Sequence, residues 1–128
     1  HLLGRPYRIL GRVVKGEKIG RMIGFPTANI EIEFKHKLVP ADGAYAVFVT
    51  YGGQTYKGML NIGFRPTVNG LTRSIEVHIM DFDKDIYGES LSVEFIERIR
   101  AEAKFEDIDA LKNQLREDKS LAIDILNK

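Results

Sequence analysis

The sequence contains no cysteine and no long apolar run. Without cysteine the chain has neither a disulfide framework nor the thiolate ligands of a zinc finger. Its apolar segments stay well short of the roughly 18 residues that a membrane-spanning helix needs. Lysine and arginine exceed the acidic residues by only one, 19 against 18, so no large net charge attracts the protein to nucleic acid or to a membrane surface. These absences are compatible with a globular protein of the reducing cytoplasm, and we expect a cytoplasmic location.

Common signatures for nucleotide or metal binding are also missing. The sequence has no GxxxxGK[ST] phosphate loop and no GxGxxG motif that leads into a helix. Its three histidines lie far apart, so no histidine metal cluster is visible. The stretch DFDKDIYGESLS alternates acidic residues at 81, 83 and 85 like a calcium loop, but Ile86 occupies the glycine position and Ser92 the glutamate position. We interpret this stretch as an exposed acidic turn.

The distribution of apolar residues predicts about six short strands followed by one or two helices. Alternation, or apolar runs between turn residues, marks the expected strands at 7–14, 27–34, 44–51, 54–62, 73–81 and 91–99. Gly52 and Gly53 are expected to join the third and fourth strands as a two-residue hairpin. From Asp107 the period becomes helical, with apolar residues at 108, 111, 115, 122 and 125. The 128 residues suit one domain, and short strands with glycine turns favour a sandwich or a barrel.

The stretch IGFPTANI, residues 23–30, places two small polar side chains on one side of an extended segment. Pro26 fixes its own φ and pushes Phe25 out of the helical region. Thr27 and Asn29 therefore point the same way, with Cα atoms roughly 6–7 Å apart. Their oxygens suit a hard cation such as Mg²⁺, and because both groups are neutral, nucleotide phosphates would supply the negative charge. A threonine and an asparagine that only satisfy a turn are the alternative.

The loop before this stretch is rich in glycine and positive charge. Glycine allows the backbone to approach a ligand closely, and basic side chains attract phosphates. The glycines are Gly16, Gly20 and Gly24, and the basic residues are Lys15, Lys18 and Arg21. The loop is therefore a candidate phosphate-binding element, and a solvated surface loop is the alternative that its composition leaves open.

Glu76 lies in an alternating strand, SIEVHIM, at residues 74–80. Ile75, Val77 and Ile79 point to one side of this strand, and Glu76 points to the other. If the apolar side fills a barrel, Glu76 stands on the outer wall. A carboxylate there can accept a proton from an attacking hydroxyl. From the spacing alone, an ordinary exposed strand glutamate is the simpler interpretation.

Four stretches occur in an order and spacing typical of one enzyme family. They are GRVVKGEKIGRMIGFPTANI, NIGFRPT, SIEVHIMDFDKDIYGE and RIRAEAKF. Together they resemble riboflavin kinases, from about Leu3 to the last helix, and above all the C-terminal kinase module of the bacterial bifunctional riboflavin kinase/FMN adenylyltransferase. The resemblance implies a mainly β fold, a closed six-stranded antiparallel barrel with C-terminal α-helices. It also implies one kinase domain over residues 1–128, excised from a longer chain that begins with an FMN adenylyltransferase domain.

The same resemblance implies a reaction and a set of site residues. The reaction is ATP- and Mg²⁺-dependent phosphorylation of the ribityl 5′-hydroxyl of riboflavin, which gives FMN and ADP. Thr27 and Asn29 correspond to the magnesium-binding pair and Glu76 to the catalytic base. Residues that correspond to the nucleotide side are Gly16, Lys18, Gly20, Arg21, Gly24 and Tyr87, and those that correspond to the flavin side are Asn61, Arg100, Glu102 and Phe105. The expected partners are riboflavin and ATP, with no nucleic acid and no membrane.

A non-catalytic small β-barrel is the main alternative. Such barrels also occur as modules that bind nucleic acid, and the basic loop fits one. The balanced charge and the lack of aromatic residues interleaved with basic ones argue against that class. A barrel that binds flavin without turnover is a further alternative, which an assay for riboflavin-dependent ADP formation distinguishes.

Overall fold

The structure of the chain is a computed structural model. It describes residues 7–14, 27–32, 40–68, 70–82, 84 and 86–128. The glycine-rich loop singled out above lies at 15–26 and is outside the described residues, as are Gly16, Lys18, Gly20, Arg21, Gly24 and Pro26.

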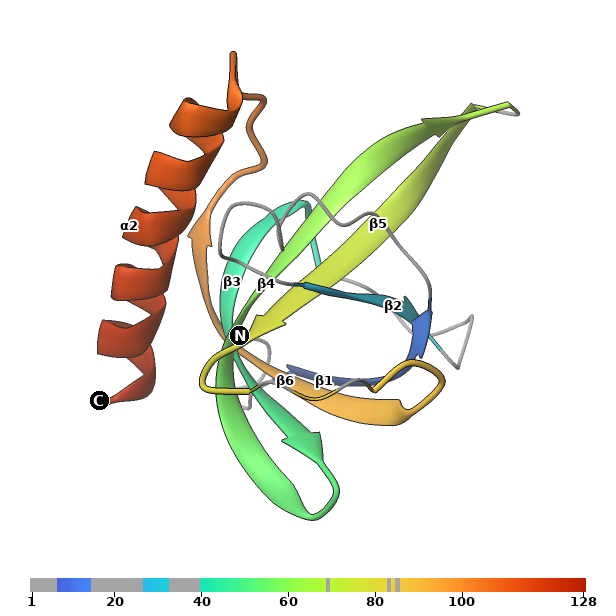
Figure 1. Cartoon of the computed structure of the whole chain (residues 1–128), viewed down its shortest axis with the longest axis vertical. Coiled ribbons are helices and arrows are strands. Elements are labelled where there is room, and N and C mark those ends of the chain that lie inside the picture. The colour runs from blue at the N-terminus through green and yellow to red at the C-terminus, as the bar shows by residue number, and fades with distance from the viewer. Residues whose placement is uncertain (1–6, 15–26, 33–39, 69, 83, 85) are drawn as a thin grey trace.

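Six antiparallel strands form a closed barrel, with the order β1-β2-β5-β4-β3-β6 around its wall (Figure 1). The strands are β1 Tyr7–Val14, β2 Ala28–Ile32, β3 Gly43–Tyr51, β4 Gln54–Thr67, β5 Gly70–Ile79 and β6 Ser90–Arg100. β1 pairs with β2 on one side and with β6 on the other, which closes the wall. The predicted closed six-stranded antiparallel barrel is confirmed.

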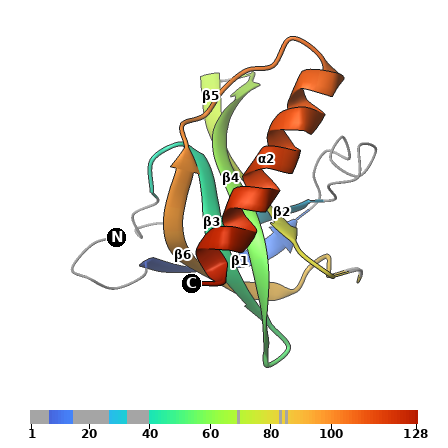
Figure 2. The same cartoon turned by 90° about the vertical axis from the view of Figure 1, so that its left-hand side faces the viewer.

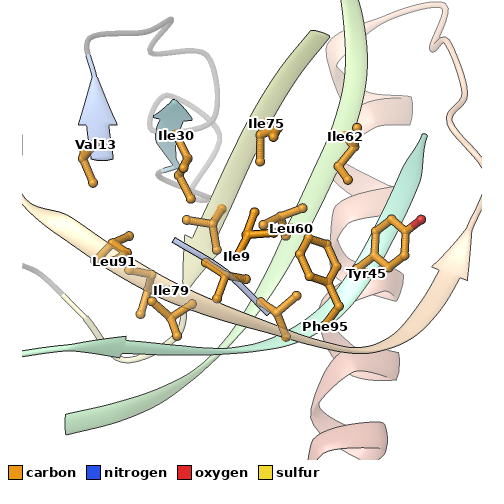
Figure 3. Close-up of a cluster of buried hydrophobic side chains, with 14 of the residues drawn as sticks. Ile9, Val13, Ile30, Tyr45, Leu60, Ile62, Ile75, Ile79, Leu91 and Phe95 are labelled. Atoms are coloured by element: carbon orange, nitrogen blue, oxygen red, sulfur yellow. The ribbon is translucent and has the colours of Figure 1, made fainter. Parts of the chain in front are cut away.

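The barrel interior is filled by one face of every strand (Figure 3). Ile75, Val77 and Ile79 all belong to this core, as the alternation in β5 predicts. Where β1 approaches β2, a side chain would not fit. A Cβ added to Gly11 would lie 2.1 Å from Cγ2 of Ile30, so the glycine allows the two strands to pack closely.

Two hairpins extend the wall. Gly52 and Gly53 have φ of 59° and 80°, so the predicted two-residue turn between β3 and β4 is confirmed. The β4–β5 hairpin is longer than the sequence indicated, because β4 continues to Thr67. The pairing of β4 with β3 stops at Ile62, and beyond it the described part of the chain gives β4 one partner, β5. Pro66 is tolerated there because a strand with one neighbour does not need a second row of N–H donors.

The C-terminal segment forms a single helix, α2 (Ile108–Leu126), which packs across the outside of β3, β4 and β6 (Figure 2). Asp107 caps its N-terminus, since its side chain accepts a hydrogen bond from the backbone N–H of Ala110 at 2.8 Å. Ala122 and Leu126 on its buried face form a second apolar cluster with three residues outside the barrel core, Ala46, Met59 and Met80. Among the described helices, none is long and apolar enough to cross a membrane.

Candidate active site

Three polar residues lie side by side on the outer wall of the barrel. Asn29 in β2 is directly opposite Glu76 in β5, and Glu76 is directly opposite Asn61 in β4. Residues opposite each other in an antiparallel pair have Cβ atoms about 4.5–5.5 Å apart. The flanking Ile75 and Val77 point into the core, so Glu76 points outward. Glu76 therefore has an amide side chain as its neighbour on each side.

Thr27 contacts the same carboxylate from the start of β2. Its Oγ1 donates a hydrogen bond to Oε1 of Glu76 at 3.2 Å, and the pair is partly buried. Asn29 is 9 % exposed. Three predicted site residues from two separate stretches thus lie together, and all of them offer oxygen atoms: Thr27, Asn29 and Glu76.

The segment between β6 and α2 lies over the other side of this group. We call residues 101–107 the connecting segment; it runs from the end of β6 to the first turn of α2 (Figure 1). Its Glu102 accepts a hydrogen bond at Oε2 from Nδ2 of Asn61 at 3.4 Å. A Cβ on Gly63 would lie 1.9 Å from the same oxygen, so the missing side chain leaves room for the carboxylate. Asn61 is therefore flanked by two carboxylates, Glu76 and Glu102.

Arg100 is the last residue of β6, and its contacts anchor the connecting segment that follows it. Its guanidinium makes a bidentate contact with Asp118 of α2, with Nη2 2.7 Å from Oδ2 and Nε 3.0 Å from Oδ1. Its Cζ lies 5.6 Å from the ring centroid of Phe105. The residues predicted for the flavin side thus fall into two contacting pairs, Asn61 with Glu102 and Arg100 with Phe105.

Tyr87 lies on a turn at the end of β1. The turn is held by two backbone hydrogen bonds of 2.9 Å, from Gly88 N–H to Val13 O and from Val13 N–H to Glu89 O. The next residue of β1, Val14, is directly opposite Asn29. Tyr87 is 62 % exposed. It lies at the same end of β1 as Asn29, without being in the polar group itself.

The donor atoms fit a magnesium ion that is completed by nucleotide. Hydroxyl, amide and carboxylate oxygens are the ligands of a hard cation. Among the described residues there is no cluster of three or more histidine, cysteine, aspartate or glutamate side chains that could hold a metal. A neutral threonine–asparagine pair beside one carboxylate therefore suits a cation whose charge is balanced by phosphates.

Comparison with known proteins identifies the family. The family model for flavokinase (riboflavin kinase) matches residues 3–126, nearly the whole chain. The chain belongs to the riboflavin kinase family. The predicted family is confirmed, and with it the predicted class of enzyme, a phosphotransferase.

Bifunctional bacterial enzymes are similar to this riboflavin kinase domain. The riboflavin kinase/FMN adenylyltransferase of Haemophilus influenzae is 51 % identical over 120 residues, which is 92 % of this chain and 38 % of that protein. The enzyme of the same name from Bacillus subtilis is 44 % identical over 125 residues, which is 95 % of this chain and 39 % of that protein. The chain thus spans well under half the length of these relatives.

Solved structures share the barrel. The crystal structure of riboflavin kinase from Trypanosoma brucei matches with a TM-score of 0.63 at 23 % identity, over 98 % of this chain and 83 % of that one. A crystal structure of a macrolide-efflux protein from Streptococcus pneumoniae matches with a TM-score of 0.87 at 41 % identity, over 94 % of this chain and 40 % of that one. Both likenesses concern the fold, and the first shows that a riboflavin kinase has the same barrel.

Two residues near the site were missed by the sequence reasoning. Gly63 leaves room for the Glu102 carboxylate, because it has no side chain. In the sequence, a glycine inside a strand indicates that another group approaches closely, but not which group. Asp118 had a clearer signal, because it interrupts the apolar face of α2 between Leu115 and Ala122. A charged residue in a buried helical stripe indicates a buried partner, and here the partner is Arg100.

Proposed function

We propose that this domain transfers the γ-phosphoryl group of ATP to the ribityl 5′-hydroxyl of riboflavin at the Thr27–Asn29–Glu76 group. The observation that carries this assignment is the position of Glu76, opposite Asn29 in β2 and hydrogen-bonded to Thr27 at 3.2 Å. An acid, two cation ligands and a partly exposed wall of the barrel then lie within one small area. Phosphoryl transfer depends mainly on positioning and charge stabilisation, and such a group can supply both.

Thr27 and Asn29 are the residues that would hold Mg²⁺, together with ATP. When bound, the ion would neutralise negative charge on the phosphate oxygens. The hydroxyl of Thr27 can offer a lone pair to a cation while its hydrogen remains directed at Glu76. Thr27 would therefore contact both the ATP-bound magnesium ion and the carboxylate of Glu76.

Glu76 is proposed to orient the ribityl hydroxyl and to take its proton. Because Thr27 donates to Oε1, that oxygen is fixed and Oε2 is the one left for the acceptor hydroxyl. An alcohol is far less acidic than a carboxylic acid, so the proton moves to Glu76 only as the bond to phosphorus forms. General base catalysis of this kind contributes typically about 10²–10⁴-fold to the rate.

The acceptor side is proposed to be formed by Asn61, Glu102, Arg100 and Phe105. The amide and carboxylate of Asn61 and Glu102 lie 3.4 Å apart and can donate to and accept from the secondary hydroxyls of a ribityl chain. Phe105 offers an aromatic face for a flat ring, and Arg100 lies over the same side chain. Riboflavin would then bind with its 5′-hydroxyl at Glu76, its ribityl chain along Asn61 and Glu102, and its flavin ring against Phe105 of the connecting segment.

The nucleotide side remains a proposal made from the resemblance. Tyr87 is proposed to border the nucleotide because its turn adjoins the end of β1 that pairs with Asn29. The glycines and basic residues at 16–24 are proposed to cover the phosphates and to exclude water, which would otherwise compete as acceptor.

The direct test is product formation by the wild-type chain. Incubation with riboflavin, ATP and Mg²⁺ is expected to give FMN and ADP in equal amounts, measured by chromatography. Omission of riboflavin controls for plain ATP hydrolysis. Flavin binding without FMN would instead support a non-catalytic barrel. Salt-sensitive binding of a single-stranded oligonucleotide without FMN would support the nucleic-acid module.

The whole natural protein is proposed to be bifunctional. The relatives that this chain matches are named as riboflavin kinase/FMN adenylyltransferases, and the chain spans 38 % and 39 % of two of them. A preceding FMN adenylyltransferase domain would use the FMN made here as its substrate. A cytoplasmic location stays a prediction, which cell fractionation tests.

A further inference from the structure

Asp118 is a charged residue in the buried face of α2. Its relative exposure is 1 %, although it lies on the helix between apolar residues that pack on the barrel. Its carboxylate accepts hydrogen bonds from Nε and Nη2 of Arg100 and from Nε2 of Gln114, at 2.7–3.0 Å. Both carboxylate oxygens therefore accept hydrogen bonds, and the Arg100 side chain is held by two parallel bonds.

The ion pair between Arg100 and Asp118 is not expected to add much to the stability of the fold. Burying two charges removes their hydration, and their attraction offsets that loss only with good geometry, so apolar residues of similar volume often serve stability as well. The rest of the α2 contact is already apolar, through Ala122 and Leu126. What the pair adds is a fixed direction for the Arg100 side chain, which an apolar contact does not give.

The fixed Arg100 side chain in turn contacts two residues of the connecting segment. Its Nη1 donates to the backbone oxygen of Ala101 at 3.1 Å, and its Cζ lies 5.6 Å from the ring of Phe105. Between them lies Glu102, whose carboxylate contacts Asn61 over Gly63. A continuous set of contacts thus runs from Asp118 on the helix to Asn61, the strand neighbour of Glu76.

We propose that Asp118 is a positioning residue for the flavin acceptor, acting through Arg100 and the connecting segment. The inference rests on the proposed function, since it assigns the acceptor to Asn61, Glu102 and Phe105. It predicts an asymmetric effect. Loss of the Asp118 charge displaces the segment that holds riboflavin, while Asn29 lies in β2, on the opposite side of Glu76 from Asn61.

The test compares the Asp118→Asn variant with the wild-type chain. We expect the KM for riboflavin to rise by about tenfold or more, because small displacements of a positioned substrate have large effects. The KM for ATP is expected to stay within about twofold, because its predicted ligands are untouched. Quenching of riboflavin fluorescence gives the Kd without turnover, and this Kd is expected to rise in parallel. Asp118→Glu keeps the charge paired but moves the carboxylate by one methylene, and it should show the same asymmetry if Asp118→Asn does not fold.

Leu126→Ala is the matched control. Leu126 is 7 % exposed and packs in the same helix–barrel contact, eight residues beyond Asp118 and outside the Arg100 contacts. Its loss is expected to lower the melting temperature without changing the riboflavin KM. An equal riboflavin KM shift in Leu126→Ala, or an unchanged riboflavin Kd in folded Asp118 variants, would overturn the positioning role. Absence of FMN formation by the wild-type chain would instead remove the proposed function.

Discussion

The hydroxyl of Thr27 donates a hydrogen bond to Oε1 of Glu76 at 3.2 Å, joining the start of β2 to the middle of β5. Neither residue alone is unusual for a strand. Their contact places the proposed cation ligand and the proposed proton acceptor on one oxygen-rich surface. It also gives the Glu76 carboxylate a preferred orientation, because one of its two oxygens is already engaged.

The first prediction concerns this hydrogen bond. Thr27→Val keeps the shape of the side chain but removes the hydroxyl, so it loses both the cation ligand and the donor to Glu76. We expect kcat/KM for Mg·ATP to fall by about 10²-fold. Thr27→Ser restores the hydroxyl and should recover most of the loss. Steady-state kinetics with ATP and riboflavin varied in turn measures the effect, and equal losses for Val and Ser would argue against a role of the hydroxyl.

Asn61 provides a test of how the acceptor is recognised. Its amide lies between Glu76 and Glu102, where a ribityl chain is proposed to bind. Asn61→Ala should lower kcat/KM for riboflavin by about 10-fold, the effect of losing roughly one hydrogen bond to a positioned substrate. For a flavin that carries a 5-hydroxypentyl chain, without secondary hydroxyls, the same variant should have little effect. Similar losses with both substrates would show that Asn61 does not contact the ribityl hydroxyls.

Gly11 offers a test of the barrel itself. An alanine at this position would bring a Cβ to 2.1 Å from Cγ2 of Ile30. Overpacking of this kind typically costs about 1–3 kcal/mol, so Gly11→Ala should lower the free energy of unfolding by that amount. In the Ile30→Ala background the added methyl group has room, and the cost of Gly11→Ala should shrink or change sign. Urea denaturation of the four proteins gives this coupling, and strictly additive effects would contradict the close contact.

Much of the barrel was predictable because its signals are local. The alternation Ile75-Glu76-Val77 correctly predicted which side of β5 faces the core, and Gly52-Gly53 correctly predicted a hairpin. The extent of the β4–β5 hairpin was not predictable in the same way. It depends on where β3 begins, at Gly43 beside Ile62, which is a property of the register and not of the β4 sequence.

The sequence predicts candidate site residues, which stay a prediction, but it does not predict their arrangement. The pattern of Thr27 and Asn29 indicated a cation site, and Glu76 was expected on the outer wall. Their meeting depends on the β2–β5 register, which joins segments almost fifty positions apart in the sequence. The alternation of apolar and polar residues within one strand does not reveal which strand pairs with it. The expectation that these residues belong to one site therefore came from the resemblance to riboflavin kinases. Asp118 was missed for a different reason, since its partner is known only once α2 is packed.

A pH-dependent effect is expected from Tyr45. Burial raises the pKa of its phenol above the ordinary 10.0, and the carboxylate of Asp42 adds to this while Arg98 opposes it. The folded protein therefore keeps the proton where the unfolded chain loses it. The resulting stability is fully present below about pH 10 and is lost as the pH rises through the folded pKa. In Tyr45→Phe the free energy of unfolding should decline less steeply above pH 10, and parallel curves for the two proteins would contradict this origin.

The central claim is that Glu76 takes the proton of the ribityl hydroxyl, and Glu76→Gln tests it most directly. The substitution keeps the shape and a hydrogen-bonding oxygen but removes the basic group, so kcat should fall by about 10²–10⁴-fold. The riboflavin Kd from fluorescence quenching should stay within about threefold, because the acceptor side is assigned to other residues. Glu97→Gln, at an exposed glutamate of β6, is the matched control and should keep wild-type kcat. A Glu76→Gln protein that binds riboflavin and retains near-normal kcat would contradict the account.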